Sequence, residues 1–146
     1  MIYLAGSCAS EHRTFMTEIA KYLRDNGQEV YCPFELKIEN AWDYSQEEWS
    51  QKVFEADKEA IDNCDVFLMI TPGRISSAGT NWEQGYAFGI GKNVIVFQIT
   101  ESPTSLMTFC GCTRFVNTSK NKILMDIYNY VLNDGPATGK CTTTLT

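Results

Sequence analysis

Histidine is nearly missing from this sequence, since His12 is the only one among 146 residues. Cysteine occurs six times, but Cys110 and Cys112 are separated by a single glycine and do not form the CxxC pair of a zinc site. The glycine pattern GxGxxG is absent, and residues 86–93 do not match a phosphate-binding P-loop. We therefore expect neither a metal nor an organic cofactor.

Positive charge is scarce as well, because the chain has 12 Lys and Arg residues but 18 Asp and Glu residues, which gives a net charge of −6. This balance disfavours a nucleic acid polymer or an anionic membrane as partner, although it permits a small anion held by backbone amides. No apolar run approaches the roughly 20 residues that cross a bilayer. The first residues show neither the basic flank nor the cleavage site of a signal peptide. We expect a cytoplasmic protein with reduced cysteines.

Short apolar runs alternate with amphipathic segments along the chain. Strands are expected at residues 1–5, 29–32, 65–70 and 94–99, with a weaker one at 114–116. Helical periodicity predicts helices at 11–24, 45–63, 80–90 and 119–133, and a short helix or turn at 104–110. This order predicts one α/β domain over residues 1–134, with a doubly wound, mostly parallel five-stranded sheet of the flavodoxin or Rossmann type and helices on both faces. Residues 135–146 are expected to form a loose tail.

The segment SSAGTNWEQGYAFGIGK, residues 76–92, follows an apolar strand and opens a helix. Thr80 and Glu83 match the capping-box pattern, with Thr80 as the N-cap. This pattern predicts Glu83 on the first turn, where backbone N–H groups favour anions and the helix dipole helps to keep the carboxylate ionised. Glu83 is then either a cap alone or a functional carboxylate.

Two further residues are expected at the same edge of the sheet. Tyr3 lies in the first strand, close to the point where the strand order reverses, and Asp57 lies on the helix before the third strand. A phenol and two carboxylates suit glycosyl transfer, in which one carboxylate attacks the anomeric carbon and the other handles the proton of the leaving group. The plainer alternatives are a strand aromatic for Tyr3 and a solvated helix residue for Asp57.

An ordered set of short motifs covers most of residues 1–100: IYLAG at 2–6, Asp57 followed by CDV at 64–66, SxGxxWEQGYA at 77–87 and GKNV at 91–94. In this set the chain resembles the nucleoside 2-deoxyribosyltransferase superfamily, which includes transferases and related nucleoside 5'-monophosphate N-glycosidases. The resemblance implies that Glu83 is the nucleophile that takes the sugar as a covalent ester. It implies that Tyr3 orients Glu83 and that Asp57 helps to protonate the departing base.

The resemblance also implies a substrate site shared between subunits of a homo-oligomer, at least a dimer. Gly6 and Gly79 belong to the expected substrate site, and Ser77 matches a position that contacts the 5' end of the sugar. Ser105 matches a position that a neighbouring subunit donates to the same 5' end, and Met107 would line the neighbour's site. The implied partner is a small nucleoside or nucleotide.

Three departures from the family pattern bear on the substrate. The transferases that use nucleosides typically carry Asp at the position of Ser77 and Asn at that of Ser105, and hydroxyls accept a 5'-phosphate that an Asp would repel. The nucleotide-hydrolysing relatives, however, tend to carry Arg where Ala9 stands. The segment 33–37 lacks the Gln that reads the base in some transferases.

The sequence thus predicts cleavage of the bond between a deoxyribose and its base, with transfer to a second base or to water. The sequence leaves open whether the substrate is a nucleoside or a 5'-monophosphate and whether its base is a purine or a pyrimidine. It also leaves open whether the reaction ends in transfer or in hydrolysis. A non-catalytic nucleotide-binding module on the same architecture is the competing class. Such a module has no need of Tyr3, Asp57 and Glu83 together, so we favour an enzyme. Trp42, Tyr44 and Trp49 would either cover a base or pack in loops and interfaces.

Overall fold

The alternating pattern of the sequence folds into a parallel sheet, seen in a computed structural model that describes residues 1–7, 10–133 and 145. Within these residues the strands are β1 (Ile2–Ala5), β2 (Val30–Tyr31), β3 (Val66–Thr71), β4 (Asn93–Gln98) and β5 (Arg114–Asn117). Their spatial order is β2-β1-β3-β4-β5, and every pairing is parallel. The predicted α/β fold is confirmed, and the strand order reverses between β1 and β3.

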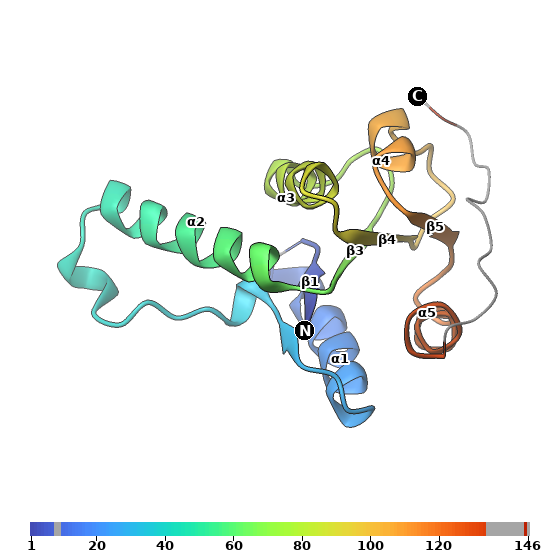
Figure 1. The fold of residues 1–146 in the computed structure, drawn as a ribbon, viewed down its shortest axis with the longest axis horizontal. Helices are drawn as coiled ribbons and strands as arrows, with labels where there is room; N and C mark the ends of the chain where they lie inside the picture. Colours follow the sequence, from blue (N-terminus) through green and yellow to red (C-terminus); the bar gives the residue numbers. More distant parts are fainter. Residues whose placement is uncertain (8–9, 134–144, 146) are drawn as a thin grey trace.

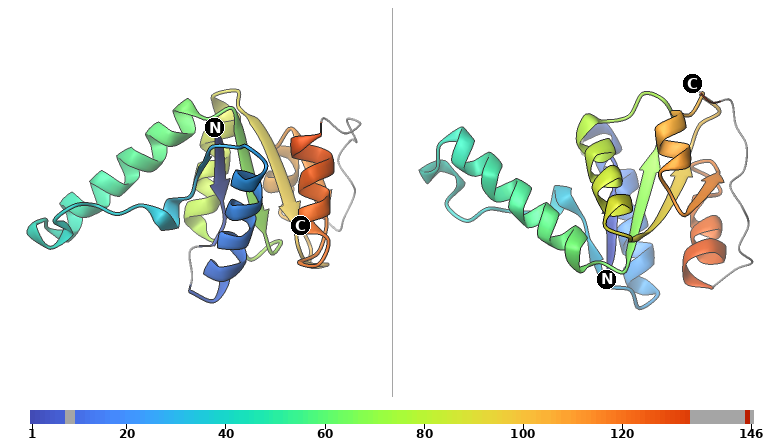
Figure 2. Two further views of the ribbon diagram at one scale, coloured as in Figure 1. Left: turned by 90° about the horizontal axis from the view of Figure 1, so that it is seen from below. Right: turned by 45° about the horizontal axis from the view of Figure 1, so that its top comes forward.

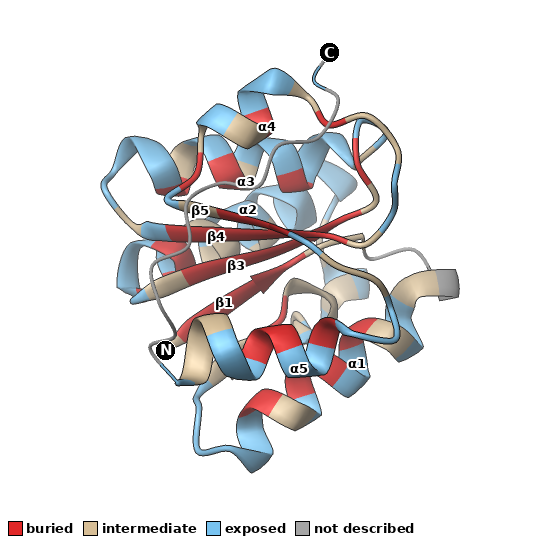
Figure 3. Cartoon of the chain, turned by 90° about the vertical axis from the view of Figure 1, so that its right-hand side faces the viewer, coloured by how far each residue is buried: buried red, intermediate tan, exposed pale blue. Residues whose placement is uncertain are grey.

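Helices cover both faces of the sheet, as Figure 3 shows. They are α1 (Ser10–Asp25), α2 (Gln46–Asn63), α3 (Ala78–Gly89), α4 (Leu106–Cys110) and α5 (Ile123–Ile127). One apolar core joins Ile2 and Leu4 of β1 to α1 and α5. The other joins Tyr3 and Ala5 of β1 to α2 and α3. Alternate residues of the same strand thus serve opposite cores, which is why the strands read as continuous apolar runs.

Helix α2 extends away from the sheet, and the chain after β2 runs out beside it to its far end (Figures 1 and 2). This chain includes two 3₁₀ turns, Pro33–Glu35 and Ala41–Asp43. A capping box begins α2, since the Ser45 hydroxyl accepts from the backbone N–H of Glu48 and the Glu48 carboxylate accepts from that of Ser45. Only the C-terminal part of α2 carries buried residues, Ala60 and Ile61.

The predicted last helix, residues 119–133, differs from the observed one. The α-helix begins at Ile123, and it continues as a π-helical turn, Tyr128–Leu132. Ile123 and Ile127 of this helix are buried in the core beside α1. The expected tail, residues 135–146, lies outside the described residues apart from Leu145, which forms an isolated parallel bridge with Thr104.

Two loops at the carboxyl ends of β3 and β4 are held together. Ser102 donates from its hydroxyl to the Pro72 carbonyl at 2.8 Å, and the Arg74 N–H donates to the Pro103 carbonyl at 2.7 Å. Gly73 has φ +111°, and a Cβ atom there would lie 1.9 Å from the Ser102 Oγ atom. Glycine is therefore required at this contact, which fixes the loop that leads into α3.

Candidate active site

A cavity of about 450 Å³ opens between α2 and α3, on the face of the sheet that these two helices cover. Asp57 of α2 and Glu83 of α3 both line it. The lining residues are Trp49, Ser50, Val53, Phe54, Asp57, Lys58, Ile61, Gly79, Trp82 and Glu83. The structure thus brings the two carboxylates predicted from the sequence to one cavity, although 26 positions separate them along the chain.

Tyr3, on strand β1, contacts Glu83, on helix α3. The Tyr3 side chain is fully buried, and its hydroxyl donates a hydrogen bond to Oε2 of Glu83. The pKa of Glu83 is raised to about 7, chiefly by burial; the hydrogen bond from Tyr3 works against this by favouring the ionised form, and the charge of Asp57 adds to it. Burial, followed by the charge of Glu83, raises the pKa of Tyr3, so the phenol stays protonated and remains a donor.

The expected start of α3 was wrong by three residues. Ser77, and not Thr80, is the N-cap, because the Ser77 hydroxyl accepts from the Thr80 N–H at 3.1 Å. Thr80 is buried, and its hydroxyl donates to the Gly6 carbonyl at 3.2 Å. Glu83 is therefore the sixth residue of the helix and caps nothing. Glu83 therefore lies beyond the predicted first turn, where the effect of the helix dipole has fallen off, and burial raises its pKa.

Asp57 has a partner that the sequence analysis missed. The Tyr31 hydroxyl donates to Oδ1 of Asp57 at 2.8 Å. Burial raises the pKa of Asp57, and the hydrogen bond from Tyr31 works in the opposite direction. The signal that could have identified Tyr31 is its place in the short strand before Pro33, where a parallel neighbour of Tyr3 would stand.

Aromatic side chains form one wall of the cavity. Phe54 meets Trp82 edge-on at a centroid distance of 5.2 Å, and Trp82 stacks on Tyr86 at 5.4 Å. Trp49, one of the residues considered as a cover for a base, lines the same cavity. Trp42 is 84% exposed and is not among the lining residues. The cavity offers flat apolar surfaces next to two carboxylates.

Ser77 lies beside a second hollow of about 250 Å³ at the carboxyl ends of β1 and β3. Its described lining residues include the hydroxyls of Ser7, Ser76 and Thr80 together with His12, and none of them is acidic. Gly6 does not line either hollow, but its lack of a Cβ matters, because one would lie 2.6 Å from the Cε atom of Met16. Ala9, where relatives tend to carry Arg, is outside the described residues.

Ser105 and Met107 do not share the cavity of Glu83 within one chain. They line a separate hollow of about 510 Å³ on another side of α3, next to Phe88 and Cys110. Met107 is 74% exposed. Their predicted contribution to a neighbouring subunit's site therefore stays a prediction.

The described part of the chain contains no group of three or more His, Cys, Asp or Glu side chains placed to hold a metal ion. Among the cysteines of the described residues, Cys32, Cys64 and Cys112 are buried and Cys110 is exposed. None of the described helices is long and apolar enough to cross a membrane.

Known proteins resemble this chain in sequence and in fold. A family model described as nucleoside 2-deoxyribosyltransferase matches residues 2–133. Among solved structures, a 2-deoxyribosyltransferase from the bacterium Bacillus psychrosaccharolyticus is 28% identical with a TM-score of 0.70, covering 84% of this chain and 89% of that one. No curated protein matches the sequence.

Two more distant solved structures share the fold. A CMP N-glycosidase from Clostridium botulinum has a TM-score of 0.61 at 18% identity, covering 86% of this chain and 96% of that one. A conserved protein from Enterococcus faecalis has a TM-score of 0.66 at 20% identity, covering 89% of this chain and 98% of that one.

Proposed function

This chain belongs to the nucleoside 2-deoxyribosyltransferase family, and from that premise we propose that it is a cytoplasmic enzyme that cleaves the N-glycosidic bond of 2'-deoxynucleosides or of their 5'-monophosphates. The observation that carries the proposal is the contact between Tyr3 and Glu83 beside the cavity that Asp57 also lines. A carboxylate oriented by a buried phenol, with a second carboxylate lining the same cavity, suits glycosyl transfer through a covalent intermediate.

The reaction begins with attack of the Glu83 carboxylate on the anomeric carbon. The bond to the base breaks through an oxocarbenium-like transition state, the base keeps the electron pair, and the Asp57 carboxyl group supplies a proton to it. A 2'-deoxy sugar eases this step, because it lacks the electron-withdrawing hydroxyl beside the developing cation. A second base or water then attacks the anomeric carbon of the sugar ester and gives up a proton to the Asp57 carboxylate, and the Glu83 carboxylate leaves and is restored. No step calls for a metal or an organic cofactor.

The hydrogen bond from Tyr3 directs the nucleophile. Oε2 of Glu83 accepts from the phenol, so Oε1 is the oxygen left for attack. Burial keeps part of the Glu83 population protonated near neutral pH, since its pKa is about 7. The aromatic wall of Trp49, Phe54 and Trp82 supplies stacking surfaces for the base.

A product assay on the purified protein tests the proposal. Deoxycytidine, deoxyadenosine and their 5'-monophosphates are incubated with and without a second free base, and released or exchanged base is measured by chromatography. We expect base release or exchange that Glu83→Gln abolishes and that Glu18→Gln, an exposed substitution on α1, leaves intact. No product from any substrate, or full activity in Glu83→Gln, would support the non-catalytic binding module instead.

A 5'-monophosphate N-glycosidase, releasing the sugar to water, is the second candidate. The hollow beside Ser77 favours it, because its described lining offers hydroxyls and His12 and no carboxylate. We expect Ser77→Asp to lower kcat/KM for a 5'-monophosphate by about 10-fold or more while changing that for the nucleoside much less, since a carboxylate repels a phosphate. Equal losses on both substrates would remove the argument for a phosphate at this position.

The shared site is tested by mixing subunits. We propose that Ser105 and Met107 complete the site of a neighbouring copy, since their hollow lies apart from that of Glu83 within one chain. Glu83→Gln and Ser105→Ala proteins are then mixed after separate purification. Recovery of activity in the mixture is expected if one intact composite site forms, whereas no recovery speaks for sites built from single chains.

A further inference from the structure

The register of the sheet places three aromatic rings side by side. Tyr31 of β2 pairs with Tyr3 of β1, and Tyr3 pairs with Phe67 of β3. The rings of Tyr31 and Tyr3 stack at a centroid distance of 5.4 Å, and those of Tyr3 and Phe67 at 5.3 Å. Cross-strand packing of this kind leaves each ring little freedom to move.

The two phenols of this row reach carboxylates on different helices. Tyr3 donates to Glu83 on α3, and Tyr31 donates to Asp57 on α2 at 2.8 Å. Burial, followed by the hydrogen bond to Asp57, raises the pKa of Tyr31, so its hydroxyl keeps its proton and stays a donor. Tyr3 and Tyr31, which lie on neighbouring parallel strands, thus each hold one of the two carboxylates of the proposed reaction.

The ionisable groups near Asp57 come from two strands and one helix, in addition to α2 itself. They are Tyr31 on β2, Tyr3 on β1 and Glu83 on α3. Lys58, the next residue on α2, pairs its ammonium group with Asp62 at 3.3 Å and lies over the Tyr86 ring. Tyr31 is therefore the side chain that holds the Asp57 carboxyl group by a hydrogen bond.

We propose that Tyr31 is a positioning residue for Asp57, an inference that rests on the proposed function. Its hydroxyl occupies Oδ1 of the carboxyl group and leaves Oδ2 as the oxygen that carries the proton to the departing base. The row of stacked rings then fixes the direction of Oδ2 relative to Glu83, in the same way that Tyr3 leaves Oε1 of Glu83 for attack. One strand register orients both catalytic groups.

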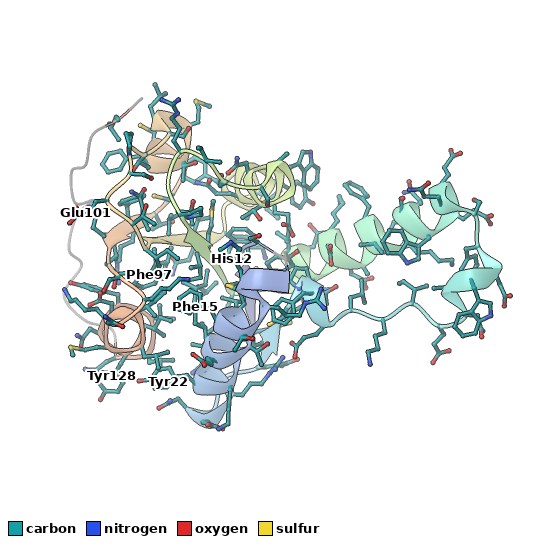
Figure 4. All side chains as sticks on the ribbon, turned by 180° about the vertical axis from the view of Figure 1, so that it is seen from behind. His12, Phe15, Tyr22, Phe97, Glu101 and Tyr128 are labelled. Carbon is teal, nitrogen blue, oxygen red and sulfur yellow. The ribbon has the colours of Figure 1, made fainter. Side chains whose placement is uncertain are left out.

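The kinetic test compares leaving groups that differ in their need for a proton. Tyr31→Phe keeps the stacked ring and removes the hydroxyl, and Tyr128→Phe, on the face of the sheet covered by α1 and α5 (Figure 4), is the matched control. The substrates are deoxyadenosine and 7-methyl-deoxyguanosine, each carrying the 5' group that the wild type prefers. The base of the 7-methylated substrate is already cationic and leaves as a neutral molecule without a proton.

With deoxyadenosine we expect Tyr31→Phe to lower kcat about 10-fold with little change in KM, because Tyr31 acts through Asp57 and not on the substrate. With the 7-methylated substrate we expect kcat close to that of the wild type. An equal loss of kcat on both substrates would mean that the Tyr31 hydroxyl supports the packing of the site as a whole. An unchanged kcat on both substrates would mean that the hydroxyl has no role in the reaction. Either result overturns the inference.

A second measurement needs no activity at all. The Asp side-chain carboxyl signals are titrated by ¹³C NMR, and Asp57→Asn identifies the Asp57 signal. The Asp57 pKa should move to higher pH in Tyr31→Phe and stay in place in Tyr128→Phe, because the lost hydrogen bond favours the ionised carboxylate. An unchanged pKa refutes the contact and with it the inference, even in an active enzyme. A shifted pKa in a protein that releases no base refutes the proposed function and leaves the contact standing.

Discussion

Replacing Tyr3 by Phe removes a single hydroxyl from the centre of the site. The ring is fully buried between Tyr31 and Phe67, at centroid distances of 5.4 and 5.3 Å, so Phe keeps the apolar packing of the strand. What disappears is the donor to Glu83. The substitution therefore tests the hydrogen bond separately from the fold.

The expected effect follows from the worth of a hydrogen bond to a charged group, about 1.5–3 kcal/mol. Since one pKa unit corresponds to about 1.4 kcal/mol, the pKa of Glu83 should rise by about one to two units. In the wild type its pKa of about 7 leaves about half of the carboxylate ionised at neutral pH. In Tyr3→Phe about 1–10% would remain ionised, and base release at pH 7 should fall by about 5- to 50-fold.

Two assays check this prediction. The Glu83 pKa is read from a ¹³C titration of the Glu carboxyl signals, with Glu83→Gln to identify the resonance. The rate of base release in a single turnover at pH 7 gives the loss of nucleophile. A Glu83 pKa that stays in place or falls in Tyr3→Phe would refute the claim that the phenol favours the ionised carboxylate.

Three other predictions follow from the same contacts. Asp57→Asn should lower kcat for an unmodified base by about 10²- to 10⁴-fold, and much less for a base that leaves without a proton; equal losses would deny the acid role. Burial holds the folded-state pKa of Glu83 above its unfolded value of 4.5, so the free energy of unfolding should fall as pH rises from about 4.5 to about 7, by at most ~3 kcal/mol. Urea titrations should show a flatter pH dependence in Glu83→Gln, and an unaltered slope would contradict the burial argument. Gly73→Ala should lower the free energy of unfolding by about 1–3 kcal/mol, because its Cβ atom would overlap Ser102, whereas Gly89→Ala, whose Cβ atom meets nothing within 4 Å, should be neutral or raise it; equal melting temperatures would refute the loop contact.

The start of α3 shows how far local patterns could be trusted. Thr80 and Glu83 fit the spacing of a capping box, but Ser77 also fits an N-cap, with its hydroxyl bound to the Thr80 N–H at 3.1 Å. Spacing alone could not choose between them. Tertiary structure chose, because the buried Thr80 hydroxyl is directed to the carbonyl of Gly6 in another loop. The consequence for Glu83 was large, since its environment is set by burial and not by the helix end.

The sequence by itself determined the α/β class, the order of strands and helices, and the family to which the chain belongs. It could do so because alternating apolar runs and the motifs at 2–6 and 77–87 are local features, each readable within a few residues. Tyr3, Asp57 and Glu83 were also readable as candidates on that basis.

Only the tertiary structure decided how these candidates act on one another. The contact of Tyr3 with Glu83 spans 80 positions and that of Tyr31 with Asp57 spans 26. Both depend on which strands are neighbours and on which residues face each other across the sheet. Strand order and register are collective properties of the packed core, and so is the burial that raises the pKa of Glu83 to about 7. No short segment of the sequence specifies strand order, register or burial.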